Sequence, residues 1–157
     1  MKTLFYSLAF FLIATLASAQ AITQERLQGA WKICAFNVNG INWDFKTDVV
    51  TLPAEYEAST LGPSQKEAMI ADIRAGLADY KDGSFVIKGN YVEQSMAGQT
   101  ASGTFSLQEQ NKKWYINIVN DDAAKTTETL MVALKDGKMQ LTIPDGMGGI
   151  TILTYCK

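Results

Sequence analysis

The sequence contains no histidine, which removes the side chain that most often serves as a general base and as a transition-metal ligand. It also lacks a phosphate-binding glycine loop, a G-x-S-x-G nucleophile motif and any C-x-x-C pair. Charge is nearly balanced, with 14 basic and 16 acidic residues, so no nucleic-acid partner is expected. We therefore expect a protein that is not an enzyme and that holds no metal and no cofactor.

Proline is scarce, and the three prolines are isolated, so no proline-rich linker divides the chain. Residues 1–19 have the features of a secretory signal peptide: Lys2 near the start, an apolar stretch, and the small residues Ala17-Ser18-Ala19 at a cleavage site. A membrane anchor is the alternative, but the apolar run is short for a span and no basic stop signal follows. We expect one exported domain over residues 20–157, periplasmic or extracellular, without a transmembrane segment. The sequence carries no signal for an oligomeric state.

Only two cysteines occur, Cys34 and Cys156, and they lie near the two ends of the expected domain. In an exported protein an even pair indicates a disulfide, which here would close a loop of roughly 120 residues. Two buried free thiols are the alternative, because spacing alone does not show proximity.

Short alternating segments separated by turn residues dominate the rest of the chain, and this pattern predicts about eight short β-strands. Most connections have the length of a hairpin, and Asn39-Gly40, Asp136-Gly137 and Asp145-Gly146 supply residues that tolerate positive φ. Consecutive antiparallel strands favour an up-and-down barrel or a sandwich. The expected strands are 30–38, 84–88, 91–96, 101–108, 113–119, 127–134, 138–143 and 150–156.

One amphipathic helix is predicted within residues 62–83, with Ser64 as the N-cap candidate and Glu67 three residues later. Its apolar residues recur at helical spacing: Met69, Ile70, Ile73 and Leu77. We consider two placements for this stripe. It closes one barrel mouth as a lid or plug, or it packs on the outside of the barrel.

The opening motif Leu27-Gln28-Gly29-Ala30-Trp31 resembles the G-x-W signature of the lipocalin family. The chain is similar in particular to small secreted lipocalin-like domains of Bacteroidetes-type bacteria, through Asp82-Gly83-Ser84-Phe85, the segment 103–107 and the final segment 154–157. The resemblance implies a mainly β fold: a lipocalin-like antiparallel eight-stranded up-and-down barrel with one amphipathic helix inserted between the first and second strands. Two departures are clear, since the chain lacks a T-D-Y-type motif and a helix after the last strand.

The resemblance also implies structural roles for Gly29 and Trp31. In the family, the tryptophan plugs the closed end of the barrel, the glycine allows close approach of another segment, and a basic residue covers the indole. Lys157 and Arg26 are the candidates for that basic residue. If strand alternation places Trp31, Ile33 and Ala35 inside, Phe36 faces outward, unless a β-bulge near a cysteine reverses the alternation.

Alternation also identifies the residues expected to line the barrel interior. They are Phe85, Ile87, Phe105, Leu107, Trp114, Ile116, Leu130, Val132, Met139 and Leu141. An eight-stranded barrel either is filled by such side chains or holds one small ligand, and both readings stay open. Small residues at Ala101 and Gly103 would leave space.

The preferred function is non-enzymatic binding of a small hydrophobic or amphipathic ligand. The alternative is a filled barrel that serves as a protein–protein or cell-surface interaction module.

Overall fold

A computed structural model describes residues 21–57, 61–144 and 148–157; the expected signal peptide and the Asp145-Gly146 turn lie outside these residues. Within the described ranges the chain forms ten strands and a few short helical segments. In chain order the elements are α1 (Gln24–Leu27), β1 (Gly29–Val38), β2 (Ile41–Asp44), β3 (Val49–Thr51), α2 (Ala54–Glu57), α3 (Pro63–Gly76), the 3-10 helix η1 (Ala78–Tyr80), β4 (Ser84–Lys88), β5 (Tyr91–Met96), β6 (Gln99–Gln110), β7 (Lys113–Asn120), β8 (Thr127–Lys135), β9 (Lys138–Pro144) and β10 (Ile150–Cys156).

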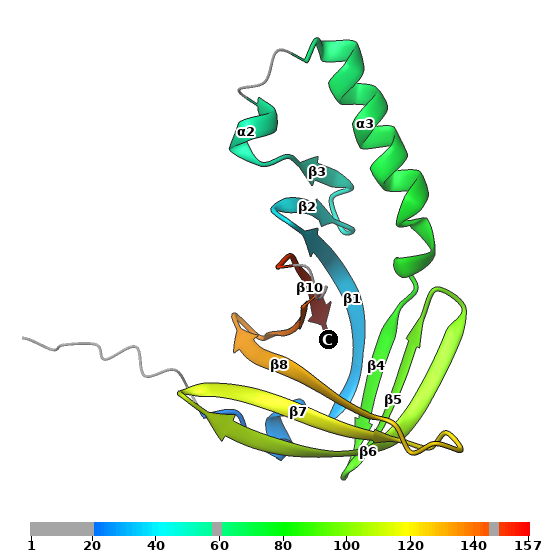
Figure 1. Cartoon of the computed structure of the whole chain (residues 1–157), viewed down its shortest axis with the longest axis vertical. Helices are drawn as coiled ribbons and strands as arrows, with labels where there is room; N and C mark the ends of the chain where they lie inside the picture. The colour runs from blue at the N-terminus through cyan, green and yellow to red at the C-terminus, as the bar shows by residue number, and fades with distance from the viewer. Residues whose placement is uncertain (1–20, 58–60, 145–147) are drawn as a thin grey trace, which may run out of the picture.

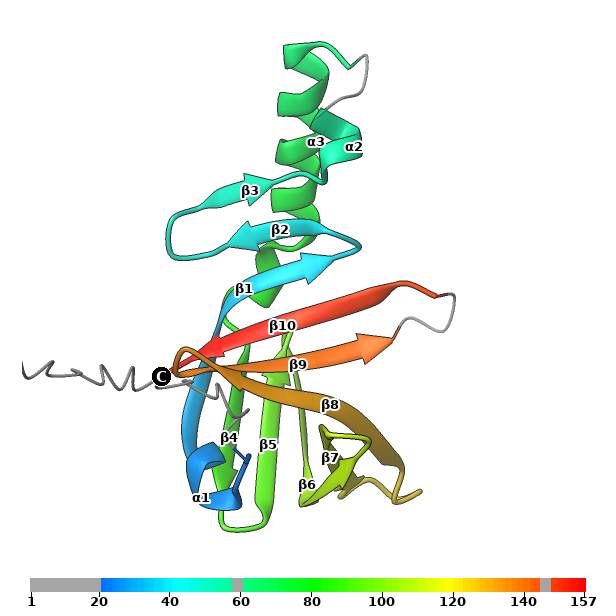
Figure 2. The ribbon, with the colours of Figure 1, turned by 90° about the vertical axis from the view of Figure 1, so that its left-hand side faces the viewer.

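The strands from β4 to β10 pair as an antiparallel meander, and β1 pairs with both β4 and β10. This double pairing closes eight strands of the described chain into a barrel (Figure 1, Figure 2). The expected mainly β, eight-stranded up-and-down barrel is confirmed, and the helix lies between the first and second barrel strands as predicted.

Strand β1 takes part both in the barrel and in a smaller sheet that extends from it. Its first half pairs with β4, whereas Ala35–Val38 pair with β2, which in turn pairs with β3. The hairpin of β2 and β3 stands with α2 and α3 beyond the end of the barrel (Figure 1, Figure 2). We call these four elements the arm. The irregular sequence after Asn39-Gly40 therefore builds an extension of the barrel sheet.

Turn residues end the strands where the sequence predicts. Asn39 and Gly40 have φ of 49° and 85°, and Asp136 and Gly137 have φ of 51° and 75°. Consecutive positive φ values are typical of the tight turns that match strand twist, and Asn, Asp and Gly adopt them at least cost. These dipeptides thus fix the register of the hairpins β1–β2 and β8–β9.

A β-bulge in β1 resolves the conflict in its alternation. Ile33 pairs with Tyr155 and Ala35 with Thr154, so Cys34 is the extra residue between them. Trp31 and Ile33 are buried before the bulge and Phe36 after it, whereas Ala35 is only half-buried. The bulge therefore turns Phe36 into the core, which is the alternative that the sequence left open for a bulge near a cysteine. Cys34 forms the predicted disulfide with Cys156, with Cα atoms 5.8 Å apart.

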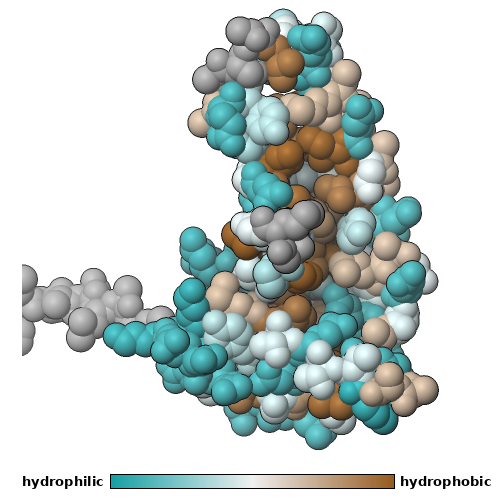
Figure 3. Space-filling view, viewed as in Figure 1, coloured by the Kyte–Doolittle hydropathy of each residue, from teal (hydrophilic) through white to brown (hydrophobic). Residues whose placement is uncertain are grey.

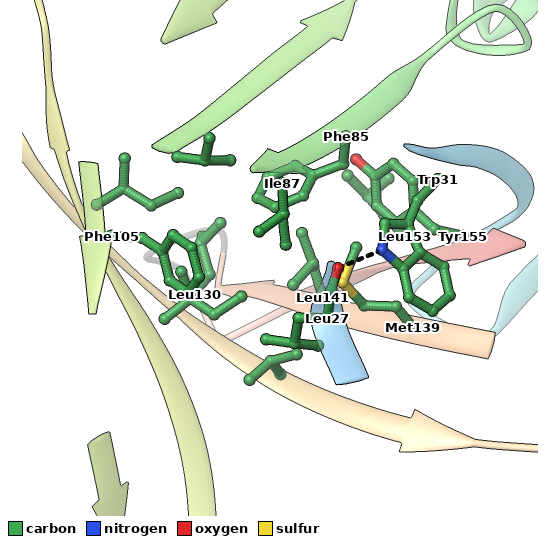
Figure 4. Packing of buried hydrophobic residues seen from close by; sticks show 14 of the residues in the cluster. Leu27, Trp31, Phe85, Ile87, Phe105, Leu130, Met139, Leu141, Leu153 and Tyr155 are labelled. Atoms are coloured by element: carbon green, nitrogen blue, oxygen red, sulfur yellow. Dashed lines mark hydrogen bonds between the residues drawn. The ribbon is translucent and has the colours of Figure 1, made fainter. Parts of the chain in front are cut away.

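Trp31 lies at the closed end of the barrel, where its indole Nε1 donates a hydrogen bond of 2.7 Å to the carbonyl of Leu27 (Figure 4). The Lys157 ammonium lies 4.4 Å from the centroid of the Trp31 ring, so Lys157 is the basic partner of the indole. Gly29 has φ of 114°, and the Lys157 side chain passes close beside it. The structural roles expected for Gly29 and Trp31 stay predictions, and these contacts are those that a test would address.

The helix begins earlier than the sequence indicates. Gly62 is its N-cap, Pro63 its first residue, and the side chain of Gln65 accepts a hydrogen bond of 2.9 Å from the N–H of Gly62. Ser64 is therefore inside the first turn, so its prediction as N-cap is wrong. Proline favours the first helical position because the missing N–H needs no partner there.

Gly103 lies where the backbone of β7 approaches β6 too closely for a side chain. A Cβ at this position would overlap the carbonyl oxygen of Val119 and lie 3.0 Å from the Cα of Asn120, both backbone atoms that cannot move aside. We expect Gly103→Ala to lower the free energy of unfolding by about 3 kcal/mol in urea denaturation. Gly76→Ala is the matched control, because a Cβ there meets nothing within 4 Å; equal effects of the two changes would refute the packing argument.

The disulfide gives a second prediction. It joins residues 122 positions apart, and the chain-entropy relation assigns such a loop about 5 kcal/mol of stabilisation. We expect the double variant Cys34→Ser, Cys156→Ser to lose roughly this much in urea denaturation. Wild-type protein treated with a thiol reductant should approach the stability of the variant. A variant as stable as the oxidised wild type would contradict the prediction.

Candidate functional site

The ten residues predicted to line the interior come together in the barrel core. Eight of them are buried, and Leu107 and Trp114 are partly buried against the same cluster (Figure 4). Phe85, Ile116, Met139 and Leu141 have 0% exposure, which leaves no water-sized space beside them. Around these four side chains the interior is filled, so a ligand site must lie elsewhere in the barrel.

A cleft of about 570 Å³ opens at the end of the barrel opposite Trp31. It lies between the end of β5, the start of β6, the start of β8 and the end of β9. We call it the mouth. Its described lining residues are Gln94, Met96, Gln99, Thr100, Ala101, Glu128, Thr129, Leu130, Ile143 and Pro144. Of the ten predicted interior residues, Leu130 also borders this cleft, so core and mouth are continuous.

Polar groups in and below the mouth are held by specific hydrogen bonds. The Gln94 amide donates a long bond of 3.5 Å to the hydroxyl of Tyr155, whose burial raises its pKa far above the usual range. Asn120 donates to the carboxylate of Glu128 at 3.3 Å and to Thr126 at 3.0 Å. The Tyr155 hydroxyl therefore stays protonated, and the orientation of Glu128 is set by its neighbour.

The mouth combines these polar groups with apolar side chains from facing strands. Met96, Leu130 and Ile143 supply hydrophobic surface, and Gln94, Glu128 and Thr129 supply hydrogen-bonding groups. A volume between roughly 300 and 1,000 Å³ and a mainly apolar lining with a few oriented polar groups are typical of small-molecule sites. This arrangement suits an amphipathic molecule better than a purely apolar one.

Sequence reasoning missed most of the mouth because it followed only apolar positions. Val92 and Leu130 are both buried, and the same alternation carried two residues toward the strand ends reaches Gln94 and Glu128. The signal was therefore present, but polar side chains at inward positions look like solvent-facing ones in a sequence. Ala101, expected to leave space, does border the mouth. Gly103 leaves none, because the backbone of Val119 approaches it closely.

Within the arm, helix α3 packs beside the hairpin of β2 and β3. Met69, Ile70, Ile73 and Leu77 are half-buried, and none of the fourteen α3 residues, all of them described, is fully buried. Figure 1 and Figure 2 show α3 rising away from the barrel beside β2 and β3. Neither placement considered from the sequence is the one observed, because α3 neither closes the barrel mouth nor lies on the barrel wall. Ile73 and Leu77 instead border a second, smaller cleft.

Asp48 fastens α3 to the hairpin of β2 and β3. Its carboxylate accepts a hydrogen bond of 3.1 Å from the indole of Trp43 and contacts the ammonium of Lys81 at 3.3 Å and the guanidinium of Arg74 at 3.4 Å. Lys81 also lies 4.5 Å from the centroid of the Trp43 ring. The hydrogen bond from Trp43, followed by the contacts with Lys81 and Arg74, lowers the pKa of Asp48 below its ordinary value.

Neither a metal cluster nor a membrane-spanning helix occurs in the described parts of the chain. No three carboxylate or cysteine side chains there converge as metal ligands. No helix there is both long and apolar enough to cross a bilayer.

Comparisons with known proteins give one structural likeness. No protein-family model matches the sequence. No curated protein matches it either. A crystal structure of a DUF4847 family protein from Bacteroides vulgatus is similar at 17% sequence identity and a TM-score of 0.45, over 82% of this chain and 92% of that one.

The Asp48 contacts predict a pH-dependent loosening of the arm. Because the pKa of Asp48 in the folded protein lies below its ordinary value of 3.8, the carboxylate stabilises the arm fully above that value. The stabilisation is lost as pH falls through the lowered pKa. We expect Asp48→Asn to accelerate amide exchange across α3 at neutral pH, measured by mass spectrometry.

Asp121→Asn is the matched control for this prediction. It removes an exposed carboxylate that contacts Lys125 at 3.4 Å in the loop between β7 and β8. Exchange in α3 should be unchanged in that variant. If both variants leave α3 equally protected, Asp48 does not fasten the helix.

Proposed function

We propose that the protein is an exported, non-enzymatic carrier or receptor that binds a small amphipathic molecule in the barrel mouth. The observation that supports this most strongly is the open cleft of about 570 Å³, where apolar side chains and a few oriented polar groups meet. The filled core beneath limits how deeply a ligand enters. The ligand is therefore expected to lie across the mouth and to expose one side to solvent.

Export is supported by the disulfide between Cys34 and Cys156, since such bonds persist in oxidising compartments. The features of a signal peptide in residues 1–19 point the same way. The absence of histidine from the sequence supports binding without catalysis.

Mouth binding is tested with an uncharged solvatochromic dye such as Nile red and a variant that fills the cleft. We expect Ala101→Trp to weaken dye binding at least tenfold, because the indole would occupy space now bordered by a methyl group. Binding is measured by fluorescence titration, with urea denaturation to confirm that the variant is folded.

Ala30→Trp is the matched control, since Ala30 is an exposed alanine on β1, paired with Val86 on β4. This variant should bind the dye like the wild type. Equal binding by Ala101→Trp would place the dye outside the mouth. A wild type that binds no dye or amphiphile would instead favour a filled barrel acting as a protein-interaction module.

A further inference from the structure

A second cleft, of about 240 Å³, lies between α3 and the hairpin of β1 and β2. Figure 3 shows hydrophobic residues gathered in this part of the arm. We call this cleft the arm groove. Its described lining carries no charged side chain and consists of Phe36, Val38, Ile41, Trp43, Ile73, Gly76 and Leu77. Such a lining can recognise only apolar groups.

The arm groove is held open by contacts at its edges. The carboxylate of Asp48 contacts Arg74 and Lys81 on the helical side and Trp43 on the hairpin, while the rings of Phe36 and Tyr80 lie 5.2 Å apart at the base. On the helix, Gly76 has open space where a Cβ would stand. The helix is thus fixed beside the sheet without filling the space between them.

The arm groove and the mouth are neighbours on one face of the sheet. Val38 borders the groove, Ile143 borders the mouth, and both stand opposite Thr151 of β10 in register. Residues directly opposite each other point to the same face, and adjacent strands are about 4.8 Å apart. Val38 and Ile143 are therefore about 10 Å apart, with Thr151 between them.

The two clefts differ in polarity. Among the described residues of the mouth the single charged side chain is the carboxylate of Glu128, and no basic residue borders the cleft. A cationic or uncharged polar group fits beside a carboxylate, whereas a ligand carboxylate would be repelled. The described part of the mouth is therefore suited to a polar head and the arm groove to an apolar chain.

We propose that the two clefts form one extended site for a single-chain amphiphile, with its cationic or uncharged head in the mouth and its alkyl tail along the arm groove. The proposal rests on ligand binding in the mouth and adds the class of ligand and the second half of the site. Helix α3 then contributes to binding through Ile73, and its C-cap residue Leu77 borders the groove beside it.

Chain length and head charge are tested by calorimetric titration with n-alkyltrimethylammonium ions of six to twelve carbons, below their micelle-forming concentrations. Each methylene that enters the groove should raise the affinity roughly threefold to fourfold until the groove is filled. The matched n-alkyl carboxylates should bind roughly tenfold more weakly. Glu128→Gln should remove this preference.

The position of the tail is tested with a twelve-carbon trimethylammonium ion that carries bromine at the end of its chain, since bromine quenches tryptophan fluorescence at short range. Trp43 borders the groove, whereas Trp31 lies at the closed end of the barrel. We expect quenching in the wild type and its loss in Trp43→Phe. Gly76→Leu, which fills the groove from the helix, should weaken binding of the twelve-carbon ion and leave the six-carbon ion unaffected.

The outcomes separate this inference from the proposed function. If the six-carbon ion displaces the dye from the mouth but affinity is independent of chain length and Trp43 is not quenched, the arm groove holds no tail and mouth binding stands. If carboxylates bind as well as trimethylammonium ions, the head assignment is wrong. If neither dye nor amphiphile binds the folded wild type, the proposed function fails as well.

Discussion

Closure of the sheet between its first and last strands is the constraint on which the rest of the structure depends. Strand β1 pairs with β10 along six positions, and the disulfide of Cys34 covalently joins the same two strands. Without this seam, β1 and β10 would each expose an unpaired edge, and the core would lose its enclosing wall. The bulge at Cys34 turns Phe36 into the core, while Cys34 itself bonds to Cys156 on β10.

The filled half and the open half of the barrel follow from where the large side chains stand. Trp31, Phe85 and Tyr155 meet near the closed end, and the tilted rings of Phe85 and Tyr155 lie 5.8 Å apart. Toward the mouth, small and polar side chains such as Ala101 and Gln94 stand among the apolar ones. The same alternation that builds a solid core at one end therefore leaves a cleft at the other, and the polar groups of that cleft come from strand ends.

The strands were predictable from the sequence because alternation and turn residues are local properties. The segments 84–88, 91–96 and 150–156 match the observed strands at both ends. The sequence indicated the bulge only as a conflict in the inward and outward alternation of β1. Its position could not be predicted, because it depends on which residues of β10 lie opposite β1. The mouth could not be recognised as a site, because Gln94 and Glu128 lie on strands that are far apart in sequence. Only the folded sheet brings the two side chains to the same cleft. The position of α3 likewise depends on Asp48, a residue of the turn between β2 and β3 that no helical pattern singles out.

The double membership of β1 also has a consequence for the order in which the chain folds. Its first partner, β2, follows after a two-residue turn, whereas β10 comes last in the chain. During synthesis β1 therefore appears long before the strand that completes its pairing, and loop closure over 122 residues is slow compared with hairpin formation. The early hairpin of β1 and β2 covers one edge of β1 in the meantime. The arm therefore gives the end of β1 a partner on one side before β10 arrives to pair with the other side.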